Sequence, residues 1–419
     1  MRRMDRQLEY VLRRGVTDII VEEELVRMLE AGRRLRLKMG FDPSRPDIHL
    51  GHVVGMRKLR QFQELGHQVI LIVGDWTAQI GDPSGASQTR PMLTAEEVRA
   101  NAETYMQQFF KVVDREKTDL RWQSEWFGKF DLADVVRLTS RFTVAQLLAR
   151  DDFSKRYESG RPIAVTELLY PLLQAYDSVV IEADVEFGGS DQRFNCLMGR
   201  ELQQMVGQPA QQVFLMPLLV GTDGQQKMSK SLDNYIAVEE PPNDMYGKLM
   251  SVPDDLMMDY FELLTDVPDD ELAEMRGRMA SQSVNPMDLK KRLAADIVTQ
   301  FHGAGAAKGA ASHFERTVQR KEAPKDMREV PIPHRTGLRR GDVLEVLSST
   351  GWVRSKTEAR TLMSTGAVRL WPDGDTAGDP ITGIDELMTT EVSPGAVMKI
   401  GKRRWLRLVE ETGKYPPID

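Results

Sequence analysis

Two histidines at positions 49 and 52 flank a glycine in a stretch whose residue types suit nucleotide binding. The imidazoles of His49 and His52 can donate hydrogen bonds to phosphate or ribose oxygens, and Gly51 leaves a flat piece of backbone for an adenine ring. Four residues of this kind recur by chance, so the stretch alone is more simply explained as a polar helix start on the surface.

A second stretch, Lys227-Met-Ser-Lys-Ser231, has the composition of a polyphosphate-binding loop. Lys227 and Lys230 lie three residues apart and can converge on phosphate groups as mobile point charges. Serines and a flexible backbone let such a loop close when substrate is present. A basic surface turn would explain the stretch alone, but both stretches in one sheet architecture predict a nucleotide site.

The histidine stretch is expected to lie between a strand and a helix. Apolar and charged residues alternate over 35–39, which predicts a half-buried strand, and Gly40 lets the backbone bend after it. A helical stripe of apolar residues covers 50–66, and a continuous apolar run over 67–73 predicts a strand buried on both faces. Strand, helix and strand in this order predict an α/β fold with a Rossmann-type doubly wound parallel sheet. Such sheets bind nucleotides where a strand ends and a helix begins.

The rest of the chain predicts further helices and strands of this domain, followed by two appendages. We expect helices from Thr94 to Phe110, over 130–150, over 163–177 and up to Met205, and strands over 179–185 and 213–220. The predicted organisation is a catalytic domain over 1–238, a helical domain over 239–320, a proline-containing linker over 321–335 and a small α+β RNA-binding domain over 336–419. In the last unit, Ser355 and Glu358 form a capping box whose helix carries Lys356 and Arg360 on one face.

Composition limits the class of protein. A chain of 419 residues with 41% hydrophobic and 28% charged residues is typical of a globular protein of two or three domains. It has no apolar run of membrane-spanning length and no signal-peptide core at its start, so we expect a cytoplasmic protein. The single Cys196 excludes an internal disulfide framework and a multi-cysteine zinc site. Because the net charge is −7, any surface for nucleic acid must be local.

Six motifs in order carry a resemblance to a known family. They are Gly40-Phe-Asp-Pro-Ser, His49-Leu-Gly-His52, Ile80-Gly-Asp-Pro-Ser-Gly85, Tyr170-Pro-Leu-Leu-Gln-Ala-Tyr-Asp177, Gly188-Gly-Ser-Asp-Gln192 and Lys227-Met-Ser-Lys-Ser231. The chain resembles bacterial tyrosyl-tRNA synthetases, of class I, over nearly its whole length. Its C-terminal unit is similar to the RNA-binding domain shared with ribosomal protein S-four.

The resemblance implies roles for residues at the ATP end of the site. Ser44, His49 and the two lysines would contact phosphates, His52 and Gly51 would lie near ribose and adenine, and Asp191 would bind ribose hydroxyls. The residues implied in catalysis are His49, His52, Lys227, Lys230 and Ser44, and those implied in ATP binding are Gly40, Asp42, Gly51, Gly189, Asp191 and Lys230.

At the other end the resemblance implies a tyrosine site. Asp82, Tyr170 and Gln174 would hold the α-ammonium group, Asp177 would accept the phenol hydroxyl, and Gln192 would face the reacting carboxylate. Positions 170, 174 and 177 share one helix face by their spacing.

The chain departs from the family pattern at two places. Lys38-Met39 stands where many members have Tyr-Cys, and Ala86 stands where many have a lysine, whose charge Arg90 is available to replace. Neither departure touches Asp177 or the two signature stretches.

The implied reaction is attack of the tyrosine carboxylate on the α-phosphate of ATP, followed by transfer to the 3′-terminal adenosine of tRNA(Tyr). A carboxylate is already ionised, so catalysis needs positioning and charge stabilisation rather than a general base. The expected substrates are L-tyrosine, tRNA(Tyr) and ATP with Mg²⁺, without a tightly bound cofactor or structural metal. Contacts to tRNA are expected from Arg354, Lys356 and Arg360, and a homodimer is expected with residues 110–170 at its interface.

Two alternatives remain open from the residues. A tryptophanyl-tRNA synthetase shares the signature motifs and an acid near Asp177, but Gln174, the motif over 188–192 and the C-terminal unit favour tyrosine. An inactive, synthetase-like RNA-binding protein would be expected to have lost the histidines or lysines of the two signature stretches, and this chain retains them.

Overall fold

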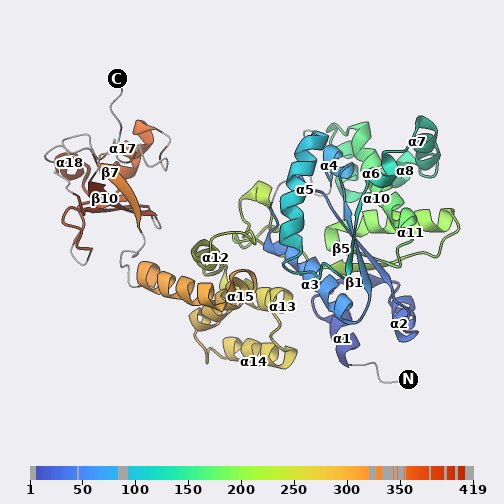
Figure 1. Cartoon of the computed structure of the whole chain (residues 1–419), viewed down its shortest axis with the longest axis horizontal. Coiled ribbons are helices and arrows are strands. Elements are labelled where there is room, and N and C mark those ends of the chain that lie inside the picture. Colours follow the sequence, from blue (N-terminus) through green and yellow to red (C-terminus); the bar gives the residue numbers. More distant parts are fainter. Residues whose placement is uncertain are drawn as a thin grey trace. The chain divides into compact units, whose positions relative to one another are not determined.

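Figure 1 shows the computed structural model of the chain, which divides into two compact units, Met1–Ala307 and Lys308–Asp419. The structure describes residues 6–44, 47–83, 93–319, 327–332, 343, 347, 353, 355–376, 379–390, 394–401 and 404–410. The predicted boundary between a catalytic and a helical domain, near residue 238, stays a prediction. No helix within these ranges is long and apolar enough to cross a bilayer.

The first unit is built on a six-stranded sheet with the order β1-β6-β5-β2-β3-β4. Its strands are β1 (Asp18–Ile20), β2 (Arg36–Phe41), β3 (Gln68–Val73), β4 (Thr118–Trp122), β5 (Val185–Gly189) and β6 (Gln212–Met216). Only β1 is antiparallel to its neighbour, and the other pairings are parallel. The predicted doubly wound parallel sheet is confirmed.

Helices cover both faces of this sheet. Its helices are α1 (Arg6–Arg13), α2 (Glu22–Glu30), α3 (Leu50–Glu64), α4 (Thr77–Ile80), α5 (Ala95–Phe109), α6 (Ser124–Phe127), α7 (Leu132–Thr139), α8 (Val144–Leu148), α9 (Asp151–Glu158), α10 (Val165–Val180) and α11 (Arg193–Met205), with short 3₁₀ turns η1 (Ser190–Gln192) and η2 (Lys230–Leu232). In Figure 1, α3 and α5 lie on one side of the sheet, and α10 and α11 lie on the other. Since β2 has β3 on one side and β5 on the other, the carboxyl ends of β2 and β5 flank the point where strand order reverses.

Several predicted elements differ from the structure. The predicted strand over 179–185 is wrong, because its first residues complete α10 and the strand β5 begins only at Val185. The single helix predicted over 130–150 is divided into α7 and α8, since Thr143 caps a new helix by accepting a hydrogen bond from the backbone of Gln146. β6 ends at Met216, directly before Pro217, which has no amide to continue the ladder. The short strand β1 was not expected.

The strand predicted to be half-buried, β2, is a central strand covered on both faces. Its alternating pattern suggested that charged residues face solvent, yet Lys38 is fully buried. The reason is an ion pair: the Nζ of Lys38 lies 2.9 Å from an Oε1 of Glu186 on the neighbouring strand β5. Pairing lets a charged residue occupy a buried strand position.

The region after residue 239 is helical, as its sequence predicted, while a separate helical domain over 239–320 stays a prediction. It contains α12 (Pro242–Leu249), η3 (Asp254–Leu256), α13 (Met257–Leu264), α14 (Asp269–Ala280), α15 (Pro286–Phe314), which is kinked at Gly303, and the π-helical turn η4 (Glu315–Gln319).

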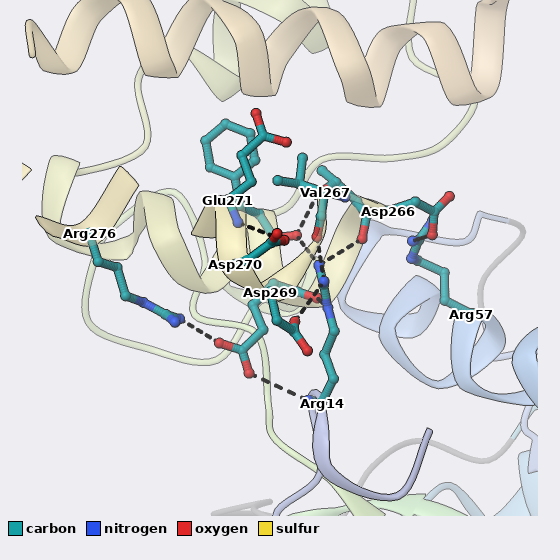
Figure 2. Close-up of polar contacts among 12 residues, drawn as sticks. Arg14, Arg57, Asp266, Val267, Asp269, Asp270, Glu271 and Arg276 are labelled. Carbon is teal, nitrogen blue, oxygen red and sulfur yellow. Dashed lines mark hydrogen bonds and ion pairs between the residues drawn. The ribbon is translucent and has the colours of Figure 1, made fainter. Parts of the chain in front are cut away.

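Arg14 joins the N-terminal segment to this helical region (Figure 2). Its guanidinium donates to the carbonyl oxygens of Phe261, Glu262, Thr265 and Val267 and to the carboxylate of Asp269, all between the end of α13 and the start of α14. Arg14 thus binds the last turn of α13 and the connection to α14 from a segment distant in sequence. On the other side, the Nζ of Lys58 in α3 donates to the carbonyls of Val11 and Arg14.

The second unit contains a four-stranded sheet with the order β7-β10-β9-β8. Besides the end of α15 and the turn η4, its described elements are β7 (Arg328–Ile332), α17 (Lys356–Ser364), β8 (Val368–Trp371), α18 (Ile384–Leu387), β9 (Val397–Ile400) and β10 (Arg404–Glu410). The linker prediction over 321–335 is therefore wrong for 328–332, which pair in parallel with β10. The predicted helix start at Ser355 is confirmed, because its side chain accepts a hydrogen bond from the backbone of Glu358.

Candidate active site

A cavity of about 330 Å³ lies at the carboxyl ends of β2 and β5, against the start of α3 and one face of α10. The predicted site residues that line it are Gly40, Asp42, Ser44, His49, Gly51, His52, Asp82, Tyr170, Gln174, Asp177, Gly189, Asp191, Gln192 and Lys227. Lys230 is not among the lining residues, although its charge lowers the pKa of both histidines. Residues as distant in sequence as 40 and 227 therefore meet in one cavity.

The two histidines lie ring against ring, with centroids 3.9 Å apart. Burial and the charge of Lys230 lower the pKa of His52 to about 3, and burial lowers the pKa of His49 well below its usual value, so both are neutral at pH 7. The Nδ1 of His52 accepts a hydrogen bond from the backbone N–H of His49 at 3.2 Å. Its proton is then on Nε2, which leaves one N–H to donate to a ligand.

The histidine stretch is bonded to the segment that follows the lysine loop. The backbone N–H of Leu50 donates to Ile236 at 3.0 Å, and that of Val238 donates to Ile48 at 3.0 Å, while His49 and Ala237 form a bridge. The histidine stretch is thus bonded through the backbone to residues 236–238, shortly after the lysine stretch, which the sequence did not indicate.

The side chain of Asn234 stabilises the lysine loop through hydrogen bonds to its backbone. Its side chain accepts from the backbone of Ser229 and donates to the carbonyls of Gln226 and Lys227 and to the carboxylate of Asp223. It packs against Gly221 so closely that a Cβ there would collide with it. Sequence reasoning missed this residue because one asparagine after a basic loop has no pattern of its own.

At the mouth of the cavity, the Nζ of Lys227 lies 2.7 Å from an Oδ2 of Asp191. The first was predicted to bind phosphates and the second ribose, and the structure pairs them with each other. Both side chains are partly exposed.

Asp177 lies deep in the cavity and is held by two donors. Its Oδ2 accepts from the Nε2 of Gln123 at 2.8 Å, and its Oδ1 accepts from the Nε1 of Trp126 at 3.1 Å. Burial raises the pKa of Asp177 to about 7, against the lowering effect of Lys38. Gln123 and Trp126 come from the segment after β4 and were not predicted, since neither belongs to a motif.

The other predicted tyrosine contacts form a hydrogen-bonded wall. The hydroxyl of Tyr170 donates to Asp42 at 2.7 Å, and Gln192 donates to Asp82 at 2.8 Å. Behind them, Asn195 donates to the side-chain oxygens of both Gln174 and Gln192. Arg150, also buried and also missed, donates to Asn195 at 3.0 Å.

The predicted tRNA contacts belong to the second unit. Lys356 and Arg360 are exposed on α17, one turn apart, while Ala359 between them is buried. Arg354 lies outside the described residues, as do Ala86 and Arg90.

Comparisons with known proteins agree with this geometry. The family model described as tRNA synthetases class I (W and Y) matches residues 30–319. The chain is 57% identical to a tyrosine–tRNA ligase of Dehalococcoides mccartyi over 409 residues, which cover 98% of this chain and 100% of the relative. It is 48% identical to the tyrosine–tRNA ligase of Thermotoga maritima, over 95% of this chain and 96% of the relative.

A solved structure gives the same picture of the fold. The tyrosyl-tRNA synthetase of Archaeoglobus fulgidus, complexed with L-tyrosine, is 26% identical and superposes with a TM-score of 0.61. The match covers 74% of this chain and 100% of that chain.

Proposed function

The chain belongs to the class I tyrosine–tRNA ligases, and on that premise we propose that the cavity at the ends of β2 and β5 is where it forms tyrosyl adenylate. The substrates of this family's reaction are L-tyrosine, ATP and tRNA. The observation that carries the proposal is that both signature stretches and Asp177 line one cavity. The alternatives of a tryptophan enzyme and of an inactive RNA-binding protein are not retained, since the relatives above are tyrosine ligases.

ATP is proposed to bind at the mouth of the cavity. The Nε2–H of His52 donates to the nucleotide, Gly51 lets the adenosine approach the start of α3, and the N-terminus of that helix favours the phosphates. When ATP binds, the carboxylate of Asp191 accepts hydrogen bonds from the ribose hydroxyls in place of its ion pair with Lys227. Lys227 can then bind the departing pyrophosphate together with Lys230. Catalysis then comes from positioning and from cations around the charge that develops.

Tyrosine is proposed to bind with its ring toward Asp177 and its amino group toward Asp82, Tyr170 and Gln174. A buried carboxylate that accepts the phenol hydroxyl rejects phenylalanine, because that analogue leaves the acceptor unpaired; a tyrosyl-tRNA synthetase is the standard example of this effect. Gln192, hydrogen-bonded to Asp82, lies where the reacting carboxylate would pass.

Mg²⁺ is proposed to enter with ATP as part of the substrate, held mainly by the phosphate oxygens. Among the described residues there is no group of three or more histidine, cysteine, aspartate or glutamate side chains placed to bind a metal ion.

A homodimer is proposed to form through the segment 110–170. Large apolar side chains are exposed there, including Leu132 at 78% and Val165 at 76%. Further exposed apolar residues in the same segment are Val135, Val136, Val144 and Tyr157. Exposed apolar side chains of this size suit a surface that a partner subunit covers.

The second unit is proposed to bind tRNA through Arg354, Lys356 and Arg360 on and before α17. The two exposed basic side chains on one helix face suit contact with phosphates. Because the reaction serves translation, we place the protein in the cytoplasm.

The site assignment is tested by ATP–pyrophosphate exchange with tyrosine, tryptophan and phenylalanine supplied separately. Exchange is expected with tyrosine alone. Asp177→Asn should raise the KM for tyrosine and leave that for ATP, whereas Asp191→Asn should do the opposite. If both variants changed the same KM, the proposed division of the cavity would be wrong.

A further inference from the structure

A buried cluster of charged and polar side chains lies directly behind the proposed tyrosine site. At its centre, the Nζ of Lys38 has three acceptors: the carbonyl of Gln174 at 2.7 Å, the hydroxyl of Ser178 at 2.7 Å and the carboxylate of Glu186 at 2.9 Å. Lys38 and Glu186 are both fully buried. An ammonium has three N–H groups, so the site satisfies every one of them.

The acceptors bracket the part of α10 that faces the cavity. Gln174 lies three residues before Asp177, and Ser178 lies immediately after it. Glu186 binds the same two residues, because its carboxylate accepts hydrogen bonds from the Nε2 of Gln174 at 3.1 Å and from the hydroxyl of Ser178. Lys38 itself does not line the cavity, so it acts through the residues that do.

The hydrogen bonds from this cluster fix the orientation of the Gln174 side-chain amide. Because its Nε2 donates to Glu186, its oxygen faces Asn195, which donates to it at 3.0 Å. The positive charge of Lys38 also lowers the pKa of the Asp177 carboxyl group. Strands β2 and β5 thus place a fixed ion pair behind the part of α10 that carries Gln174 and Asp177.

We propose that Lys38 is a specificity-determining positioning residue, which holds the 174–178 turn of α10 in place and keeps Asp177 available as a charged acceptor for a hydroxylated aromatic amino acid. The inference deepens the proposed function and rests on its assignment of Asp177 to the tyrosine hydroxyl.

The groups around Asp177 predict how the site responds to pH. Burial is the largest influence and raises its pKa, Glu186 raises it further, and Lys38 and the hydrogen bonds from Gln123 and Trp126 lower it. Lys38 and Glu186 therefore act on Asp177 in opposite directions, although they form one ion pair. A purely structural pair would impair the site in the same way whichever member was removed.

The test measures the KM for tyrosine against pH by ATP–pyrophosphate exchange in Lys38→Met, Glu186→Gln and the double variant. Lys38→Met should move the pH at which tyrosine binding is half-lost upward by about one pH unit, with a KM at pH 7 raised roughly tenfold and little change in kcat. Glu186→Gln should move it downward. The double variant, which leaves no unpaired buried charge, should fall between the single variants and guards against failure of Lys38→Met to fold.

Two controls separate the possible failures. Lys58→Met removes another buried lysine, on α3, and should lower stability without moving the pH profile. If Asp177→Asn weakens tyrosine binding while the Lys38 and Glu186 variants keep the parent profile, or shift it in the same direction, Lys38 has no role in specificity. If Asp177→Asn itself keeps the parent KM, the assignment of the tyrosine site fails and takes this inference with it.

Discussion

Replacement of Asp177 by asparagine is the change whose result the structure predicts in most detail. Each carboxylate oxygen accepts one donor, Gln123 on one side and Trp126 on the other. Asparagine has one oxygen and one NH₂ group, so in either orientation its NH₂ faces one of these donors. The variant therefore loses the charge and also disturbs the group that holds the acceptor in position.

The size of the effect follows from the bond that is lost. A hydrogen bond to a charged group contributes about 1.5–3 kcal/mol, which corresponds to roughly 10- to 150-fold in binding. We expect the KM for tyrosine in pyrophosphate exchange to rise within this range. Phenylalanine has no hydroxyl and makes no hydrogen bond to Asp177, so the substitution should not weaken its binding in this way. Discrimination between tyrosine and phenylalanine should therefore fall by the same factor.

The same substitution should remove a pH dependence. Burial raises the pKa of Asp177 to about 7, so below that pH tyrosine must displace a proton to find an ionised acceptor. The parent KM for tyrosine should rise about tenfold per pH unit below 7. Asparagine does not titrate, and its profile should be flat in this region. An unchanged KM, or an acid limb that survives in a correctly folded variant, would refute the reasoning.

Three further predictions concern positions outside the tyrosine site. Asn234→Ala should lower kcat for exchange about tenfold with little effect on the KM for tyrosine, because the lysine loop loses its internal fastening; a selective rise in that KM would contradict this. Arg14→Met should lower the midpoint of the first thermal transition, since four backbone carbonyls and Asp269 lose their donor, and an unchanged melting curve would show that water replaces it. Leu132→Asp should convert the proposed dimer to a monomer, measured by light scattering, without unfolding the chain; an unaltered mass would contradict the proposed interface.

The parts of the site that sequence predicted are those fixed by local spacing. The turn between β2 and α3 was predictable because a strand, a bend and a helical stripe follow one another without interruption. Tyr170, Gln174 and Asp177 were predicted to share a helix face, and they do line one cavity because α10 is helical through all three. Periodicity over a single element is enough for inferences of this kind.

The parts that were missed depend on contacts between distant segments. The pairing of Lys38 was not predicted because its partner, Glu186, is 148 positions away and nothing in either segment indicates it. Gln123 and Arg150 enter the site from the segment between β4 and α10, where no motif marks them. The strand predicted over 179–185 failed for a local reason, since a short apolar run at the end of a helix has the same composition as a buried strand.

The cavity has an ion pair near each end, and the two pairs differ in how readily they can be broken. At the mouth, Lys227 and Asp191 are 40% and 26% exposed, and a pair of this kind contributes only about 0–1 kcal/mol, so an incoming nucleotide can separate it. Behind the proposed tyrosine site, Lys38 and Glu186 are 0% and 2% exposed, and removing one partner of such a buried pair costs about 3–5 kcal/mol. On the proposed assignment, the ATP end is therefore able to rearrange during each turnover, whereas the amino acid end is fixed before substrate arrives. An enzyme that must distinguish tyrosine from phenylalanine by one hydroxyl needs this rigidity at the acceptor, and mobility at the phosphates does not compromise it.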